Sequence, residues 1–164
     1  MGLEHVLNAR SVAVVGASKV PTKRGYQTIR TLLDERYEGS IYPVNPKEKS
    51  IMGLKCYTAV SEIPGEVDVA LIATPARTVP AVLEDCGKKG VRGAIILATG
   101  FGETGTRGKA LEREVLDVAG RHHIRLIGPN TSGMINLKDN LNLVGLKNSP
   151  KGDILSLIHI SEPT

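Results

Sequence analysis

Apolar runs alternate with segments of helical periodicity along most of the chain. Residues 11–17 (SVAVVGA) form an apolar run with the length and the valine content of a buried strand. In residues 25–36, apolar side chains recur every three or four positions, as at Tyr26, Ile29 and Leu33, which predicts an amphipathic helix. Strands and helices that alternate in this way are typical of right-handed βαβ units, which build a parallel sheet.

The same alternation predicts further strands and helices. The strands are expected at residues 40–44, 67–74, 91–98 and 124–127, and the helices at residues 79–86, ending at Gly87 or Gly90, and 111–119. Residues 56–60 predict a short edge element before a brief turn at 61–64, whereas the asparagine-rich stretch 133–150 predicts an irregular excursion over the surface. The predicted fold class is α/β, with a Rossmann-like parallel sheet of about five strands flanked by helices.

Length and composition limit the chain to one full-sized core. The chain has 164 residues, of which 41% are hydrophobic. With no Trp and a single Phe, the packing depends on aliphatic side chains, as in parallel sheets covered by helices. We therefore expect one domain at residues 1–153, followed by a short tail at residues 154–164 that is either non-native or the truncated start of a next domain.

The charge pattern favours a small anionic ligand over nucleic acid. The formal charge of +4 comes from scattered Lys and Arg, without the dense basic run or interleaved aromatic residues of nucleic-acid surfaces. The two cysteines, Cys56 and Cys86, have neither metal-type spacing nor a disulfide pattern, so we expect free thiols in a cytoplasmic protein. No apolar run is long enough to cross a bilayer, and residues 1–10 do not resemble a signal segment, so no membrane association is expected.

Small and polar residues follow each expected strand. They are Gly16, Ala17 and Ser18 after the first strand, Val44, Asn45, Pro46 and Lys47 at the end of the second, Thr74 and Pro75 after the third, Ala98, Thr99, Gly100 and Glu103 after the fourth, and Gly128, Pro129 and Asn130 after the fifth. Each of them alone is explained by a tight turn or a strand stop. Because the carboxyl ends of parallel strands meet at one edge of the sheet, the set together favours a ligand site there.

The turn after the first strand suits a phosphate group. Gly16, Ser18 and Gly25 let the backbone approach an anion closely at the start of a helix, where free N–H groups and the helix dipole favour negative charge. The spacing differs from the G-x-G-x-x-G fingerprint of dinucleotide sites. No acid ends the second strand to hold a ribose diol, which counts against NAD.

A cation stands where NAD-binding proteins place an acid. Lys47, with Lys49 behind it, suits a ribose that carries an additional phosphate, and both NADP and coenzyme A have such a ribose. The basic insert of Lys19, Lys23 and Arg24 either contacts a pyrophosphate or is solvated. From these residues, NADP and coenzyme A both remain possible ligands.

No catalytic or metal-binding constellation is predicted. Glu103 is the only acid at a strand end, and capping of the following helix or solvation is favoured over a general-base role. His122 and His123 lie at the end of an expected helix, where a positive charge complements the helix dipole. Neither a nucleophile with a histidine base nor a pair of carboxylates can be argued from the spacing.

Five motifs in order resemble one known family over nearly all of residues 11–153. They are VAVVGAS with the following GY, IYPVNPK, DVALIATPA, ATGFGETG and IGPNTSG. The sequence resembles the CoA-binding domain of ADP-forming acyl-CoA synthetases of the acetate–CoA ligase type, which is related to the α subunit of succinyl-CoA ligase.

This resemblance implies that coenzyme A binds across the strand ends. It implies Gly16, Ser18 and Gly25 near the phosphates, Lys47 or Lys49 near the ribose phosphate, Val44, Asn45 and Pro75 beside the adenosine, and Ala98, Thr99 and Gly100 in the place of the family's Thr-Glu type loop.

Such ligases interconvert acyl-CoA, ADP and phosphate with the free acid, CoA and ATP, through a phosphohistidine. The resemblance implies that the phosphohistidine and ATP-grasp domains, with their ATP or ADP and magnesium, lie in further domains or subunits. After Ile154 the sequence reads LSLIHISEPT and departs from the family, so His159 is not expected to carry the phosphate. The isolated chain is expected to bind CoA without turnover; a stand-alone CoA-binding protein and an NADP-binding domain of an oxidoreductase are the alternatives.

Overall fold

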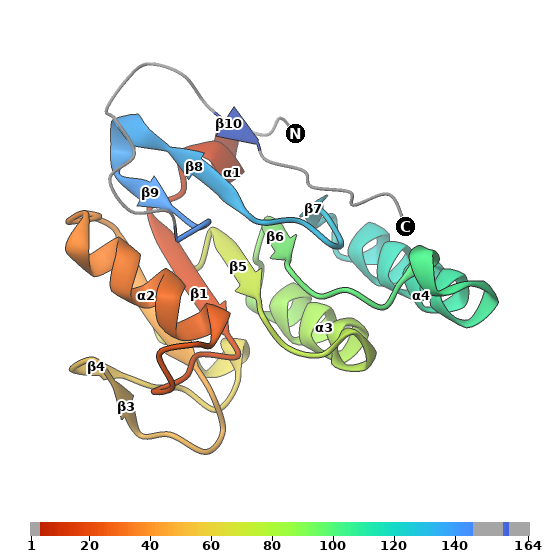
Figure 1. The fold of residues 1–164 in the computed structure, drawn as a ribbon, viewed down its shortest axis with the longest axis horizontal. Helices are drawn as coiled ribbons and strands as arrows, with labels where there is room; N and C mark the ends of the chain where they lie inside the picture. The colour runs from red at the N-terminus through yellow and green to blue at the C-terminus, as the bar shows by residue number, and fades with distance from the viewer. Residues whose placement is uncertain (1–3, 146–155, 158–164) are drawn as a thin grey trace.

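A parallel sheet of five strands forms the centre of the molecule (Figure 1). The computed structural model describes residues 4–145 and 156–157. In space the strands run in the order β2 (Ser40–Val44), β1 (Ser11–Val15), β5 (Val69–Ile72), β6 (Gly93–Ile96) and β7 (Arg125–Ile127), and all neighbours pair in parallel. The predicted α/β class and its five-stranded sheet are confirmed. The observed strands β5 and β6 are each two residues shorter than predicted at both ends.

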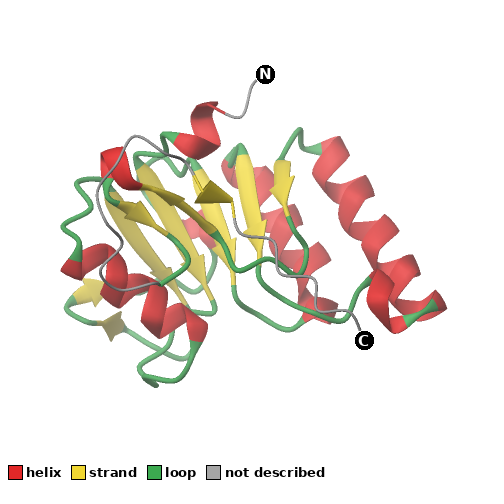
Figure 2. Cartoon of the chain, turned by 45° about the horizontal axis from the view of Figure 1, so that its top comes forward, coloured by secondary structure: helices red, strands yellow, loops and turns green. Residues whose placement is uncertain are grey.

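Alternate residues of each central strand pack against opposite sides of the sheet. On one side, Ala13 and Val15 join the core beneath α3 (Val79–Lys89), α4 (Thr106–Arg121) and a 3₁₀ turn, η1 (Val60–Glu62). On the other, Val12 and Val14 join the core beneath α1 (Glu4–Leu7) and α2 (Arg24–Asp34). Both sides of the sheet are therefore covered, as a parallel sheet requires, and Figure 2 shows helices around the sheet.

The helix ends follow ordinary capping chemistry. Helix α3 begins beside Pro80, which is tolerated in a first turn, and ends at Gly90, which adopts the left-handed conformation at φ 81°. Of the two predicted ends, Gly90 is therefore correct and Gly87 lies within the helix. Helix α4 is longer than predicted because its first turn, from Thr106, is polar and carries no periodic apolar signal. None of the described helices is long and apolar enough to span a bilayer.

Two small sheets flank the central one. One is a hairpin of β3 (Ser50–Ile51) and β4 (Leu54–Lys55), which lies just before the edge element predicted at residues 56–60. Within that predicted element, Tyr57 forms a parallel bridge to Val44 of β2. The other sheet contains β8 (Met134–Asn136), β9 (Leu141–Asn142) and β10 (Ser156–Leu157), with η4 (Leu137–Asp139) between its first two strands.

The prediction of an irregular surface excursion after residue 133 is wrong for residues 134–145. Met134, Leu141 and Leu143 are fully buried in the core beside α2. The asparagines there act as internal hydrogen-bond partners: Asn142 is buried, its side chain donates to Glu35, and it accepts from the N–H groups of residues 144 and 145. Residues 146–150 lie outside the described part of the chain.

Candidate ligand site at the carboxyl edge of the sheet

The turn after β1 joins the ends of three neighbouring strands. Gly16 has φ +85°, and the N–H groups of Gly16 and Ala17 donate to the carbonyl of Val44 at the end of β2, over 3.1 and 3.3 Å. On the other side, a Cβ on Gly16 would lie 2.9 Å from the carbonyl oxygen of Ala73, just after β5. The strand order reverses between β1 and β5, which is where open α/β sheets bind ligands.

Helix α2 starts directly on this turn. A Cβ on Gly25, in its first turn, would collide with the carbonyl oxygen of Gly16 and lie 2.9 Å from Cα of Ala17. Only glycine permits so close an approach between helix and turn. The N-cap residue, Lys23, makes no capping hydrogen bond with its side chain, so the first-turn N–H groups of a helix of 11 residues face the turn uncapped.

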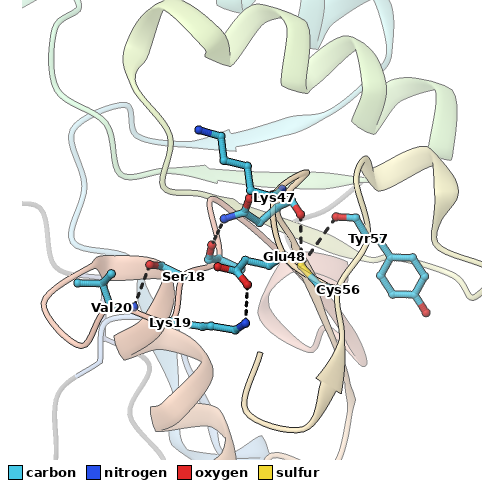
Figure 3. A network of polar contacts seen from close by, with 9 residues as sticks. Ser18, Lys19, Val20, Lys47, Glu48, Cys56 and Tyr57 are labelled. Atoms are coloured by element: carbon cyan, nitrogen blue, oxygen red, sulfur yellow. Dashed lines mark hydrogen bonds and ion pairs between the residues drawn. The ribbon is translucent and has the colours of Figure 1, made fainter. Parts of the chain in front are cut away.

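Side-chain contacts brace the β1–α2 loop against the loop after β2 (Figure 3). The amide nitrogen of Asn45 donates to the carbonyl of Ala17 over 2.7 Å, and its amide oxygen accepts from the N–H of Lys47 over 2.9 Å. Lys19 forms an ion pair with Glu48 at 2.6 Å. The predicted residues of these two loops therefore form a preformed cradle, which we define as Gly16, Ala17, Ser18, Gly25, Val44, Asn45, Pro46 and Lys47.

The Lys47 ammonium is the open positive charge of this cradle. Its side chain is exposed and points away from the braced loops in Figure 3. Within residues 4–145 it has no hydrogen bond or ion pair, and the same holds for the side chains of Lys49 and Lys23. A ligand phosphate near the end of β2 would thus lie close to lysine side chains that form no ion pair with a carboxylate of the described residues.

The basic insert of Lys19, Lys23 and Arg24 mainly holds neighbouring segments of the chain together. Lys19 is neutralised by Glu48, and the Arg24 guanidinium donates to the carbonyl of Ser132 over 2.8 Å. Burial lowers the pKa of Arg24. Two of the three cations of the insert therefore fix neighbouring segments in place, and only Lys23 stays open.

The end of β5 contributes Thr74 and Pro75. The Thr78 hydroxyl contacts the Thr74 hydroxyl at 2.9 Å and the carbonyl of Pro75 at 2.7 Å, which fixes this turn before α3. Thr74 lies against Gly16, because a Cβ added to Gly16 would be 3.1 Å from the Thr74 methyl group. The turn therefore forms the wall of the cradle on the β5 side.

The loop after β6 holds its own anion. The Glu103 carboxylate accepts from the N–H groups of Gly100, over 2.6 Å, and Phe101, over 3.1 Å. The Glu112 carboxylate accepts from the next N–H group, of Gly102, over 2.9 Å. Desolvation alone would raise the pKa of Glu103, but the hydrogen bonds from backbone N–H groups, those of Gly100 and Phe101 among them, outweigh it and bring the pKa below its usual value.

The prediction that Glu103 caps the following helix is therefore wrong. Glu103 binds N–H groups that precede it, whereas α4 begins at Thr106 behind Gly105. The neighbouring Ala98 accepts from the N–H of Asn130 over 3.1 Å, which ties this loop to the one after β7. The predicted residues of this loop thus form a second group, made up of Ala98, Thr99, Gly100 and Glu103. This group adjoins the β5 turn, because Pro75 and Gly100 line the same cleft.

No nucleophile or metal centre emerges in the described residues. Burial raises the pKa of the Cys56 thiol and raises that of Cys86 to about 12, so both are poor nucleophiles. His122 ends α4 and lies 2.7 Å from a Glu84 carboxylate oxygen. Across residues 4–145, no group of three or more His, Cys, Asp or Glu side chains is arranged to hold a metal ion.

Sequence reasoning missed three charged residues that shape this edge. Glu112 holds the loop after β6 from a position ten residues along the chain, and Arg77 and Arg107 line the cleft beside Pro75. The arginines lie shortly after strand ends, one following Thr74-Pro75-Ala76 and one following the GFGETG loop. Extending the inspection of each strand end by a few residues would have found them.

Comparison with known proteins identifies the family. A family model described as a CoA binding domain matches residues 10–136. The α subunit of acetate–CoA ligase (ADP-forming) II from Pyrococcus furiosus is 43% identical over 152 residues, which cover 93% of this chain and 33% of that protein. Acetate–CoA ligase (ADP-forming) II from Archaeoglobus fulgidus is 44% identical over 137 residues, which cover 84% of this chain and 20% of that protein.

A solved structure agrees with these sequence matches. Acetyl-coenzyme A synthetase 1 of Ca. Korarchaeum cryptofilum, in complex with phosphate and ADP, has a TM-score of 0.85 and 42% identity, and the match covers 92% of this chain and 32% of that one. The chain thus spans about a third or less of the length of these relatives. Because the family model covers the sheet and its strand-end loops, the chain belongs to the CoA-binding domain family.

Proposed function

We propose that the chain binds coenzyme A at the cradle and is the CoA-binding module of an ADP-forming acid–CoA ligase. The observation that carries the proposal is an uncapped helix N-terminus packed on the Gly16 turn beside Lys47, which has no acid partner among the described residues. The helix N-terminus favours the pyrophosphate, and the lysine favours the phosphate on the ribose.

Each part of CoA has a matching surface in this arrangement. The pyrophosphate lies over Gly16, Ser18 and Gly25, and the ribose phosphate lies beside Lys47 or Lys49. The adenosine packs between the loop after β2, at Val44 and Asn45, and the β5 turn, at Thr74 and Pro75, with Pro46 at its rim. The pantetheine arm then extends along the edge toward the loop after β6, at Ala98, Thr99 and Gly100.

Glu103 belongs to this site in a supporting role. Its carboxylate would repel a phosphate, and both of its oxygens already accept backbone N–H groups. We place it as the residue that shapes the loop along which the uncharged arm of CoA passes.

The ligase assignment rests on the relatives. Proteins similar to this chain include ADP-forming acetate–CoA ligases, of which it spans a third or less. We propose that the phosphohistidine and the ATP-grasp domain, with ATP or ADP and magnesium, reside in the remaining part of the enzyme, in the same chain or as subunits. The two free thiols fit a reducing compartment such as the cytoplasm.

Calorimetric titration of the chain with CoA, NADPH and NADH tests the proposal. CoA is expected to bind, and NADH is expected to bind at least about tenfold more weakly, because the cradle lacks an acid for a ribose diol. NADPH is also expected to bind more weakly than CoA, because the glycine spacing of the turn differs from the dinucleotide fingerprint. Mixing the chain with acetyl-CoA, ADP and phosphate is expected to yield no ATP. Binding of NADPH in preference to CoA would replace the proposal with an oxidoreductase domain.

A further inference from the structure

A cleft lies between the start of α3 and the first turns of α4, next to the β5 turn. This cleft has a volume of about 730 Å³. One wall comes from the turn at Pro75 and the 3₁₀ turn η2 (Ala76–Thr78), and the other comes from α4, which lies alongside α3 in Figure 1. The cleft is therefore large enough for a small molecule.

Two arginines without acid partners line this cleft. Arg77 lies in η2 and Arg107 lies in the first turn of α4, so they come from opposite walls. Neither guanidinium has a hydrogen bond or an ion pair within residues 4–145. Arg30 and Arg121, by contrast, each pair with a nearby acid on the helix surfaces.

Among the residues that line the cleft, basic side chains outnumber acidic ones. Glu114 is the one acid that lines it, and it forms an ion pair with neither arginine. Helix α4 begins behind Gly105, which has no side chain to cap the first turn, so its N–H groups add to the positive potential near Arg107.

Apolar side chains form another part of the lining. Pro75, Ala76 and Leu111 supply hydrocarbon surface next to the two guanidinium groups. Arginine pairs recognise planar or tetrahedral oxyanions through several N–H donors at once. Charge and apolar surface in one cleft thus match a ligand with an oxyanion at one end and a short hydrocarbon part at the other.

We propose that this cleft binds a small organic anion, a carboxylate or phosphate monoester with a short apolar group, held by Arg77 and Arg107. The site goes beyond the proposed CoA cradle. Gly16, Ser18 and Lys47 are absent from the residues that line it, and only the border residues Pro75 and Gly100 are shared with the predicted CoA path.

The test is a titration of the isotope-labelled 164-residue chain followed by amide NMR shifts. The probes are butyrate, n-butyl phosphate and the neutral analogue 1-butanol. Butyrate and butyl phosphate are expected to shift the amides of Thr104, Arg107, Gly108 and Leu111 saturably. Arg77→Ala and Arg107→Ala are each expected to weaken this binding about tenfold, the loss of one charge-assisted interaction.

A matched control separates the cleft from general charge effects. Arg113→Ala removes an exposed arginine of the same helix that does not line the cleft, so binding should be unchanged. Equal binding of 1-butanol, unchanged binding in both arginine variants, or no saturable shift at these amides would overturn the proposal.

The two ligand sites are distinguished by Lys47→Ala. This variant is expected to weaken CoA and to leave butyl phosphate unaffected, so failure of CoA binding and failure of the cleft proposal give different results. If CoA itself displaces butyl phosphate in proportion to its own occupancy, the cleft is part of the CoA site and the separate site is overturned.

Discussion

Two glycine-rich loops at the same edge of the sheet satisfy their backbone in opposite ways. After β1, the N–H groups of Gly16 and Ala17 donate to a main-chain carbonyl, and the loop is braced by an uncharged asparagine. After β6, the N–H groups of Gly100 and Phe101 donate to the Glu103 carboxylate. The loop after β1 leaves a helix N-terminus open, next to Lys47 of the loop after β2, whereas the loop after β6 already holds a negative charge.

Glycine content alone therefore does not mark a phosphate site. Glycine lets a backbone approach an anion, but the anion can be a side chain of the protein itself. The decisive feature is whether positive charge and N–H groups remain unmatched after the chain has folded. By that measure, we propose the β1 side, and not the β6 side, as the phosphate end of the CoA site.

The largest effect is expected at the contact between helix and turn. In Gly25→Ala, the added methyl group collides with the carbonyl of Gly16, so the free energy of unfolding should fall by about 3 kcal/mol and CoA binding should be lost. Urea denaturation measures the first effect and calorimetry the second.

Gly120→Ala is the control for that substitution. Gly120 lies in α4 with nothing within 4 Å of its would-be Cβ, so alanine should be neutral or stabilising by about 0.5–1 kcal/mol. A Gly25→Ala protein as stable as the parent would contradict the close packing.

Removal of the brace between the two cradle loops is expected to act next. Asn45→Ala deletes one donated and one accepted hydrogen bond, which should lower stability by about 1–2 kcal/mol and weaken CoA binding. Asn45→Asp keeps the acceptor for the N–H of Lys47 but adds a negative charge, which would repel a phosphate. Its CoA affinity should therefore fall by more than its loss of stability alone would cause. Equal CoA affinity in the aspartate variant and the parent would argue against phosphates near this loop.

The open lysines should affect binding and not folding. Lys47→Ala is expected to weaken CoA about tenfold and 3′-dephospho-CoA hardly at all, because only CoA carries the ribose phosphate. Lys49→Ala, compared in the same calorimetric series, assigns the contact to one lysine or the other. Lys88→Ala, in the last turn of α3, serves as the control. Loss of affinity for both ligands alike would contradict the assignment.

The smallest effect is expected at the loop after β6. Because the pKa of Glu103 is lowered in the folded protein, its contribution to stability is complete above about pH 4.5 and is lost as the pH falls through the lowered pKa. Glu103→Gln should remove this acid dependence at a cost well under about 1 kcal/mol, since the group is largely exposed.

Hydrogen exchange of the Gly100 and Phe101 amides is the direct measurement for that variant, and exchange should accelerate. Glu66→Gln, an exposed glutamate with no hydrogen bond within the described residues, should leave the exchange unchanged. Unaltered protection in Glu103→Gln would show that the carboxylate does not hold the loop.

The fold could be predicted from sequence because its signal is local. The runs at Val12–Val15 and Val69–Ile72 are buried on both faces of the sheet, and such strands are recognisable without knowledge of their neighbours. The segment after Gly133 was not predicted, because its buried Met134 and Leu141 have no periodic pattern and its asparagines bond to partners such as Glu35, more than a hundred residues away.

The candidate site divides in the same way. Strand ends are local features, so Gly16, Asn45 and Pro75 could be named from the sequence. Which N–H groups remain open depends on partners brought together by folding, such as Val44 for Gly16. The structural part played by Arg24 was beyond the sequence for the same reason, since its acceptor lies 108 residues away.

The most direct test of the central claim is a crystal structure of the chain with bound CoA. The pyrophosphate is expected over the start of α2 at Gly25, and the ribose phosphate is expected within hydrogen-bond distance of the Lys47 or Lys49 ammonium. CoA bound with its phosphates against the loop after β6, beside Glu103, or away from the carboxyl edge altogether, would contradict it.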